Sequence, residues 1–200
     1  DLELIKSISE LGLTTPFIYG GGIRNSKDAI EVINFGAERV VLDTVIFKNI
    51  SEVNLIAEVI GAQAILAAIP LIEQNNGTIL HYNHVMKKNE NINLNLKEII
   101  NKQKISEIII IDKEGEGSIN GFNEKFINEI SNYTSLPILV FGGIVNKKQI
   151  SRLLSKKQIS GILIGNSLNY KEHSIKKIKN SIDSKQIRAH QVNGYKWKKL

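Results

Sequence analysis

Residues 16–25 read Pro-Phe-Ile-Tyr-Gly-Gly-Gly-Ile-Arg-Asn, and residues 137–146 repeat the pattern as Pro-Ile-Leu-Val-Phe-Gly-Gly-Ile-Val-Asn. Each stretch later reaches another apolar run that ends in a polar pair, Asp43-Thr44 and Asn166-Ser167. Glycines at the carboxyl end of a strand let the backbone approach a ligand and expose N–H groups to it. A short hydroxyl residue beside them adds another donor for an anion. The repeat therefore predicts two phosphate-binding turns, each shared by neighbouring strands.

Short apolar runs alternate with stretches of helical period along the chain. Runs that are apolar throughout are typical of strands covered on both faces. We predict strands at Phe17–Tyr19, Arg39–Leu42, Ala64–Ile69, Glu107–Ile111, Ile138–Phe141 and Gly161–Ile164. Helices are predicted within residues 1–12 and at Ser26–Phe35, Ser51–Ile60, Leu96–Lys102, Asn123–Asn132, Lys147–Ser155 and Lys171–Ile182. The Asn75-Asn76-Gly77 turn predicts a small hairpin between Leu71 and Tyr82.

This regular alternation predicts a parallel sheet with crossover helices. An open, doubly wound sheet is one solution, but the internal repeat favours a (β/α)8 TIM-type barrel, which usually needs about 250 residues. On this interpretation residues 1–192 form one barrel domain that holds strands 3–8, its first two strands are missing from this chain, and residues 193–200 form a basic tail. We expect an exposed sheet edge and aggregation of the chain when it is made alone.

The composition of the 200 residues excludes some classes of function. There is no cysteine, so no thiolate chemistry is available. No apolar run approaches the roughly 20 residues that a membrane span needs, and no signal peptide is evident. The net charge of +6 comes from scattered lysines, so we expect neither nucleic-acid nor membrane binding. We expect a cytoplasmic protein without a cofactor.

Three segments carry a resemblance to a known family: residues 16–24, residues 36–40 (Gly-Ala-Glu-Arg-Val) and residues 114–122 (Glu-Gly-Glu-Gly-Ser-Ile-Asn-Gly-Phe). They resemble the cyclase subunit of imidazole glycerol phosphate synthase, a barrel of the histidine pathway. The resemblance implies a glutaminase partner that supplies ammonia and a bisphosphorylated ribulosyl aminoimidazole carboxamide substrate, which is cyclised to imidazole glycerol phosphate. The sister isomerase of the pathway shares the glycine repeat and works without ammonia, but residues 116–123 are more similar to the cyclase.

The resemblance also implies roles for particular residues. One phosphate would be held by Gly21, Gly22 and Thr44, with Asp43 where the family has asparagine. The other would be held by Gly142, Gly143, Asn166 and Ser167, with Gly117 nearby. The Asp43 carboxylate would lie beside a phosphate, which like-charge repulsion disfavours.

The expected catalytic residues match less well. The family uses two aspartates as acid and base, because ring closure moves protons at both ends of the reacting centre. One lies on the first strand, and the other position is occupied here by Pro70, which cannot transfer a proton. Glu116 stands where the family has a substrate-contacting aspartate and is a possible residual acid. Arg39 and Glu107 match two positions of the charged gate through which ammonia enters the family barrel.

One alternative function remains open, and two further groups of residues are considered as sites. A barrel that keeps the gate but has lost the base would suit a non-catalytic ammonia conduit and ligand-binding subunit of a surface-sugar amidotransferase. His81 and His84, three residues apart, have the spacing of a metal pair, but no cysteine or placed carboxylate completes a set, and we expect no metal. The acidic run Asp112, Glu114 and Glu116 is expected to face the mouth of the barrel.

Overall fold

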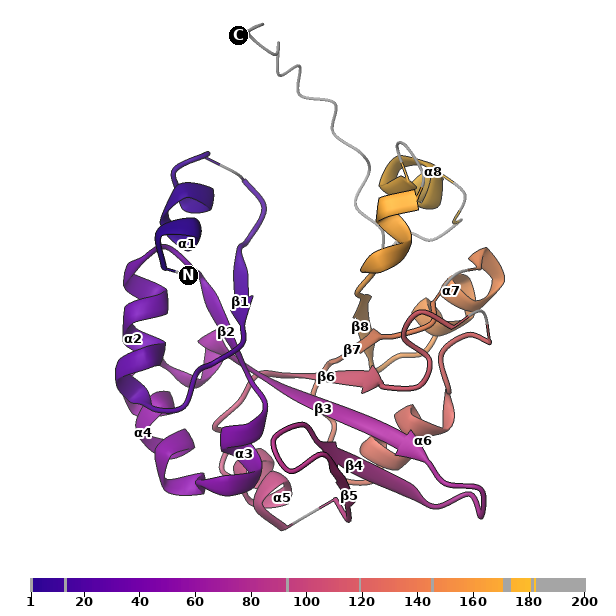
Figure 1. The fold of residues 1–200 in the computed structure, drawn as a ribbon, viewed down its shortest axis with the longest axis horizontal. Helices are drawn as coiled ribbons and strands as arrows, with labels where there is room; N and C mark the ends of the chain where they lie inside the picture. The colour runs from indigo at the N-terminus through magenta and orange to yellow at the C-terminus, as the bar shows by residue number, and fades with distance from the viewer. Residues whose placement is uncertain are drawn as a thin grey trace, which may run out of the picture.

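Six parallel strands form one curled sheet in the order β1-β2-β3-β6-β7-β8. They are β1 (Ile18–Gly20), β2 (Arg39–Leu42), β3 (Ile65–Glu73), β6 (Glu107–Asp112), β7 (Ile138–Phe141) and β8 (Ile159–Ile162). The structure is a computed structural model that describes residues 2–12, 14–92, 94–118, 120–144, 146–170, 174–180 and 182. In Figure 1 the sheet follows a U-shaped path with β1 and β8 at its two ends. This is the wall of a (β/α)8-type barrel, as the sequence predicts.

The helices lie on the outer side of this curve (Figure 1). They are α1 (Leu2–Ser9), α2 (Ser26–Asn34), α3 (Thr44–Lys48), α4 (Ile50–Ile60), α5 (Leu94–Asn101), α6 (Lys125–Ser131), α7 (Lys147–Leu154) and α8 (Ser174–Asn180), with the 3-10 turns η1 (Ala62–Ala64) and η2 (Asn166–Tyr170). α3, η1 and η2 are additions to the predicted elements. The predicted helix Lys171–Ile182 lies partly outside the described residues, and the tail 193–200 lies wholly outside them.

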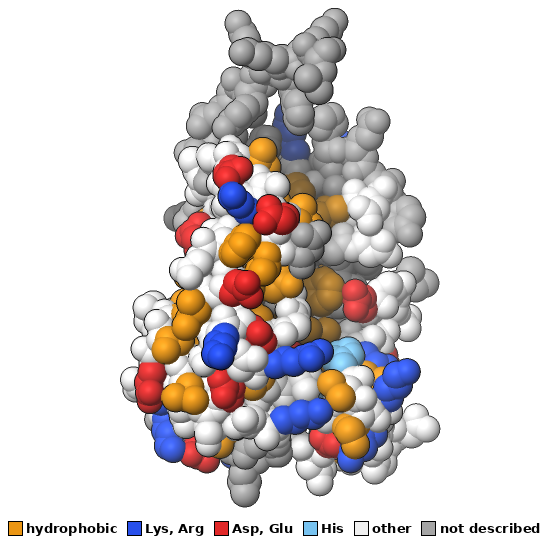
Figure 2. All heavy atoms as spheres, turned by 60° about the vertical axis from the view of Figure 1, so that its left-hand side comes forward, with side chains coloured by type: hydrophobic (Ala, Val, Ile, Leu, Met, Phe, Trp, Pro, Cys, Tyr) orange, Lys and Arg blue, Asp and Glu red, His pale blue; other side chains and the backbone are white. Residues whose placement is uncertain are grey.

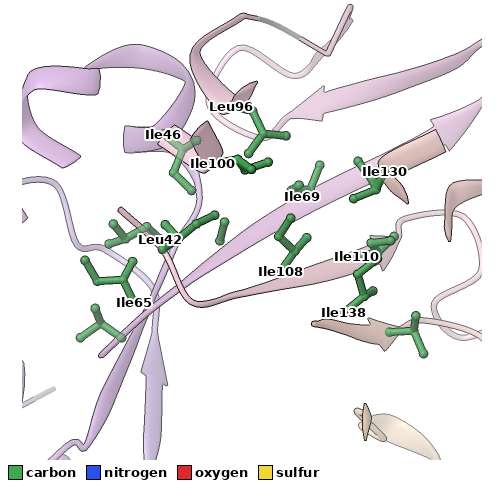
Figure 3. Packing of buried hydrophobic residues seen from close by; sticks show 14 of the residues in the cluster. Leu42, Ile46, Ile65, Ile69, Leu96, Ile100, Ile108, Ile110, Ile130 and Ile138 are labelled. Atoms are coloured by element: carbon green, nitrogen blue, oxygen red, sulfur yellow. The ribbon is translucent and has the colours of Figure 1, made fainter. Parts of the chain in front are cut away.

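The two faces of the sheet have different surroundings because side chains alternate along a strand. One set packs against the helices in the main hydrophobic core, as Figure 3 shows for Ile65, Ile69, Ile108, Ile110 and Ile138. The intervening residues point to the inside of the curve. Leu66, Ala68 and Ile109 are buried there although they lie outside the main core cluster. Residues with the same parity as these three therefore face the barrel interior.

The third strand is longer than predicted and continues through Pro70 into a hairpin. β3 pairs with β2 as far as Ala67 and with the antiparallel strand β4 (Ile79–Asn83) from Leu71 onward. Pro70 falls in the gap between these two partners, so its missing N–H removes no ladder bond on that edge. The hairpin predicted between residues 71 and 82 is confirmed. A further short strand, β5 (Lys88–Glu90), pairs with β4 and was not predicted.

The sheet has two edges among the described residues, because β1 pairs with β2 alone and β8 with β7 alone. Inward-facing apolar side chains are exposed at these edges, with Ile18 of β1 37% exposed and Leu163, just after β8, 36% exposed. The predicted open sheet edge is therefore confirmed. Aggregation of the chain stays a prediction.

Candidate functional site

The glycines of the two turns have similar, positive backbone φ angles. Gly21 and Gly22 have φ of 127° and 72°, and Gly142 and Gly143 have φ of 108° and 64°. These values lie in the region that side-chain-bearing residues rarely adopt, which is why both turns carry glycine. The asparagines that close the repeat, Asn25 and Asn146, each accept a hydrogen bond from the backbone N–H three residues later and so cap α2 and α7. The sequence repeat is thus a structural repeat.

The first turn borders a pocket of about 560 Å³. The predicted residues Gly21, Gly22, Asp43 and Thr44 all line it. The further lining residues, which sequence reasoning did not assign to the site, include Arg24, Lys48 and Val85. Arg24 directly follows the glycines and Lys48 lies one helical turn after Thr44, so their charge and spacing could have suggested them. Val85 comes from the turn after β4, which only the fold brings here.

Among the described residues, Asp43 is the one carboxylate that lines this pocket. It is partly exposed, and it precedes α3 without capping it, because its side chain makes no bond to the helix N-terminus. Burial raises the pKa of the Asp43 carboxyl, while the nearby His84 acts in the opposite direction. The carboxylate is therefore partly desolvated and has a basic neighbour, in a pocket whose other charged groups are the cations Arg24 and Lys48.

The second turn is buried beneath the loop that follows β6. A Cβ on Gly142 would lie 2.5 Å from the backbone oxygen of Asp112, and one on Gly143 would lie 2.6 Å from the backbone oxygen of Gly115. In contrast, a Cβ on Gly21 or Gly22 would meet nothing within 4 Å. The second pair of glycines therefore has a packing role in addition to any role in binding.

The remaining predicted residues of the second site lie on exposed loops. Asn166 begins η2 and is exposed, and its side-chain oxygen accepts a 3.4 Å hydrogen bond from Asn169. That bond leaves the Asn166 amide N–H groups as donors for an anion. The side chain of Ser167 lies outside the described part of the structure. Gly117 and Glu116 are exposed in the loop after β6.

The interior at the carboxyl ends of the central strands is apolar. Pro70 on β3 pairs with Ile111 on β6, which pairs with Phe141 on β7. All three share the parity of the inward-facing set, so they form a row across the interior. This row offers no group that could take or give a proton, and it places Pro70 on the inner face of the sheet.

The opposite end of the sheet holds the predicted charged pair. Arg39 and Glu107 are the first residues of β2 and β6, and Nη1 of Arg39 lies 2.6 Å from Oε2 of Glu107. Nη2 of Arg39 also donates to Oγ of Ser106 over 2.7 Å. The Arg39 and Glu107 side chains are 25% and 21% exposed, so the bridge adds at most about 1 kcal/mol to stability. The structure places both residues at strand starts, as the sequence predicts.

The expectation for the acidic run is wrong for Asp112. This residue is buried, and its carboxylate accepts hydrogen bonds from the backbone N–H groups of Gly115 and Asn123 at 2.7 and 2.8 Å. It therefore organises the loop after β6 and does not face the mouth, whereas Glu114 and Glu116 are exposed. Burial raises the pKa of Asp112, and these backbone bonds partly offset that effect.

The two histidines of the predicted pair have different surroundings. The His81 ring is 2% exposed and stacks on Phe47 of α3 with the ring centroids 3.6 Å apart, while His84 is exposed beside Tyr82. Within the described ranges no group of three or more histidine, aspartate or glutamate side chains could hold a metal ion. Across the same residues, no helix combines the length and apolar character needed to cross a membrane.

Comparison with known proteins relates this chain to one family of histidine biosynthesis proteins. Residues 1–174 match the family described as "Histidine biosynthesis protein". The imidazole glycerol phosphate synthase subunit HisF of Natranaerobius thermophilus is 24% identical over 93% of this chain and 74% of its own length. The HisF subunit of Thermotoga sp. (strain RQ2) is 30% identical over 71% of this chain and 56% of its own length. A putative HisF subunit of Leptospira borgpetersenii is 26% identical over 78% of this chain and 62% of its own length.

The family match over residues 1–174 includes both glycine turns and the strands that carry them. The curled parallel sheet, the duplicated Gly-Gly-Ile turns and the match over residues 1–174 agree with one another. The chain therefore belongs to the histidine biosynthesis protein family, as a HisF-like member.

Proposed function

We propose that this protein is a cyclase-type subunit of a glutamine amidotransferase, whose substrate is a ribulosyl aminoimidazole carboxamide with a phosphate at each end. The single observation that carries the proposal is the structural repeat of the two turns. They lie at the carboxyl ends of β1 and β7, on opposite arms of the curled sheet (Figure 1). Two anion sites across one mouth suit a ligand with two terminal phosphates. The HisF relatives support a role for this subunit in the histidine pathway.

The first phosphate would occupy the pocket beside Gly21 and Gly22, where Arg24, Lys48 and Thr44 supply charge and donors. The second would bind at Gly142 and Gly143, with Asn166, Ser167 and Gly117 around it. The product would be imidazole glycerol phosphate. The ammonia would come from a glutaminase partner and would enter past Arg39 and Glu107, whose place at the strand starts is consistent with a gate at the opposite end from the phosphates.

Proton transfer is the weak step of this chemistry in the present chain. General acid–base catalysis contributes on the order of 10²- to 10⁴-fold to a rate. Pro70 offers no such group, and its inward neighbours Ile111 and Phe141 are apolar. Glu116 is exposed in the loop after β6 and would be the remaining candidate acid. We therefore expect slow cyclisation at best.

The test is to measure turnover of the ribulosyl bisphosphate with ammonium for the native protein, Pro70→Asp and Pro70→Asn. Asparagine is close to aspartate in size and cannot act as a base, so it is the matched control. We expect Pro70→Asp to raise the rate on the order of 10²-fold, and Pro70→Asn to leave it low. Substrate binding, followed separately, shows that each variant is folded.

The conduit interpretation gains no support from the relatives, which are named as subunits of the synthase itself. The turnover assay with the Pro70 variants also tests the conduit interpretation. Measurable native turnover that equals the Pro70→Asp rate would exclude a non-catalytic conduit. If all three proteins bind the substrate and none turns it over, the cyclase assignment is wrong.

A further inference from the structure

The hairpin after β3 places an aromatic side chain beside Pro70. Ile72 of β3 pairs with Leu80 of β4, and both are buried outside the main core cluster, as the inward-facing residues are. Two residues earlier on β3 and two later on β4, the same register sets Tyr82 opposite Pro70. Residues directly opposite each other in an antiparallel pair share a face of the sheet. Tyr82 therefore stands next to Pro70 on the inner face.

A lysine from the end of β6 reaches the same place. Lys113 has the parity of the inward-facing Ile109, and its backbone N–H donates to the carbonyl oxygen of Leu71 over 3.2 Å, so the pairing with β3 extends to it. Nζ of Lys113 lies 4.2 Å from the centroid of the Tyr82 ring. Because β4 and β6 pair with opposite edges of β3, the Lys113 side chain crosses the inner face of β3 to make this contact.

The Lys113 ammonium is held by the ring and is still open to a ligand. Among the described residues it takes part in no ion pair, and the side chain is exposed. A cation is attracted to the face of an aromatic ring, while an ammonium offers three N–H donors. His84 packs edge-on against Tyr82 with the ring centroids 5.0 Å apart. In Figure 2, lysine and arginine side chains gather beside a histidine, and His84 is the exposed histidine of the described residues.

Lys113 lies between the two glycine turns. The first turn follows β1 and the second follows β7, and the strand order β1-β2-β3-β6-β7 puts β3 and β6 between them. These two strands form the base of the U-shaped path of the sheet (Figure 1). A ligand with one phosphate at each turn would therefore turn its middle part toward the strands that carry Pro70 and Lys113.

We propose that Lys113 is a specificity-determining residue of this mouth, which donates hydrogen bonds to oxygen atoms in the middle of the bisphosphorylated ligand. Tyr82 is its positioning residue, because the ring holds the ammonium over β3. The ligand class is then a bisphosphate whose ends are joined by a hydroxylated chain, and a plain alkyl chain is disfavoured. This inference rests on the proposed function and adds a polar contact at a place where Pro70 offers none.

The test compares two bisphosphates of equal length. One is the ribulosyl aminoimidazole carboxamide substrate, and the other is an analogue whose ribulosyl chain is replaced by an unsubstituted alkyl chain. Both dissociation constants are measured calorimetrically, without ammonia and at constant ionic strength. The native protein should prefer the substrate by about tenfold, as expected for a hydrogen bond from a charged donor. Lys113→Met should remove most of this preference, and Lys113→Arg, which keeps the charge, should retain more of it.

The positioning role of Tyr82 is tested in the same way. Tyr82→Leu removes the ring face and should lower the preference about two- to fivefold. Tyr82→Phe keeps the ring and should keep the preference. If Tyr82→Leu also keeps the full preference, the positioning role is wrong.

Lys97→Met is the matched control. Nζ of Lys97 also lies 4.2 Å from the centroid of a tyrosine ring, that of Tyr133, but Lys97 belongs to α5 on the outer side of the sheet (Figure 1). This variant should keep the native preference. Binding of the alkyl analogue shows that each variant is folded.

Three results would overturn the inference and leave the phosphate sites standing. The native protein binds both ligands with equal affinity, Lys113→Met keeps the native preference, or Lys113→Met weakens both ligands by the same factor, as a general attraction for anions would. If the native protein binds neither bisphosphate, the proposed function itself fails, and the inference fails with it.

Discussion

The two glycine turns share their sequence pattern, backbone conformation and helix cap, but their surroundings differ. The first turn is open, and its glycines border a pocket shared with the β4–β5 hairpin. The second is covered by the loop after β6, which approaches Gly142 and Gly143 closely. The same local motif therefore borders a pocket on one arm of the sheet and packs beneath a loop on the other.

The residue at the third position of each following helix shows the same difference. Asp28 of α2 accepts a hydrogen bond from the N–H of Arg24, within its own turn. Gln149 of α7 instead reaches across to Phe122, accepting from its N–H at 3.3 Å and donating to its C=O at 2.9 Å. The side-chain bond at the first turn stays within that turn, whereas the bonds at the second turn connect it to the loop after β6. Mutations in the two turns should therefore have different consequences.

The largest difference is expected when alanine replaces a glycine. Gly143→Ala places a Cβ against the backbone of Gly115 and Gly121 and also strains φ, so we expect a loss of about 3–4 kcal/mol in the free energy of unfolding. Gly22→Ala meets only the φ strain and should lose about 1–2 kcal/mol. Urea denaturation of the two variants measures both values. Equal losses would show that the loop after β6 can move away from the added Cβ without lowering the free energy of unfolding.

A smaller difference is expected at the helix starts. Gln149→Ala leaves the buried N–H and C=O of Phe122 without their side-chain partner, so stability should fall by about 2–3 kcal/mol. Asp28→Ala removes one exposed hydrogen bond and should lose about 0.5–1 kcal/mol. Hydrogen exchange at Phe122 provides a local readout, because only the Gln149 variant should expose that amide. Unchanged exchange there would mean that Gln149 does not hold the loop.

Much of this architecture could be predicted from the sequence. The bounds of β2 and β7 agree with the prediction, because each is a short apolar run between polar or turn residues. The strand β5, Lys88–Glu90, escaped prediction because it is polar and forms only through antiparallel pairing with β4. The five-residue helix α3 is too short to show a helical period.

In the candidate site, too, some residues could be predicted from the local sequence and others depend on the fold. The glycines and the polar pair Asp43-Thr44 belong to a local pattern, which can be recognised from residue types alone. The cover over Gly142 and Gly143 and the position of His84 depend on segments that the fold brings together. Asp112 shows the limit most clearly, because an acidic residue in a loop sequence gives no sign that two backbone N–H groups will bury it.

The last expected effect concerns the support beneath the first turn and depends on pH. Burial lowers the pKa of His81 to about 4, and neither of its ring nitrogens has a hydrogen-bond partner among the described residues. The folded protein thus binds this proton more weakly than the unfolded chain, where histidine has its ordinary pKa of about 6.5. The stabilising contribution is complete above the ordinary pKa and is lost as the pH falls toward the folded value. From pH 7 to pH 5 we expect a loss of about 2 kcal/mol from this residue.

His81→Phe should remove that part of the acid sensitivity, because phenylalanine keeps a ring for stacking on Phe47 and carries no titrating group. His84→Gln, at the exposed histidine of the same hairpin, is the matched control and should leave the loss nearly unchanged. The free energy of unfolding is measured at pH 7 and pH 5 for all three proteins, with His81→Leu as a second variant. If the native protein and both His81 variants lose equal stability, the buried ring does not titrate on unfolding. The pocket carboxylate Asp43 could not supply such a loss, because burial raises its pKa in the folded protein and a raised carboxyl pKa favours the folded state as the pH falls.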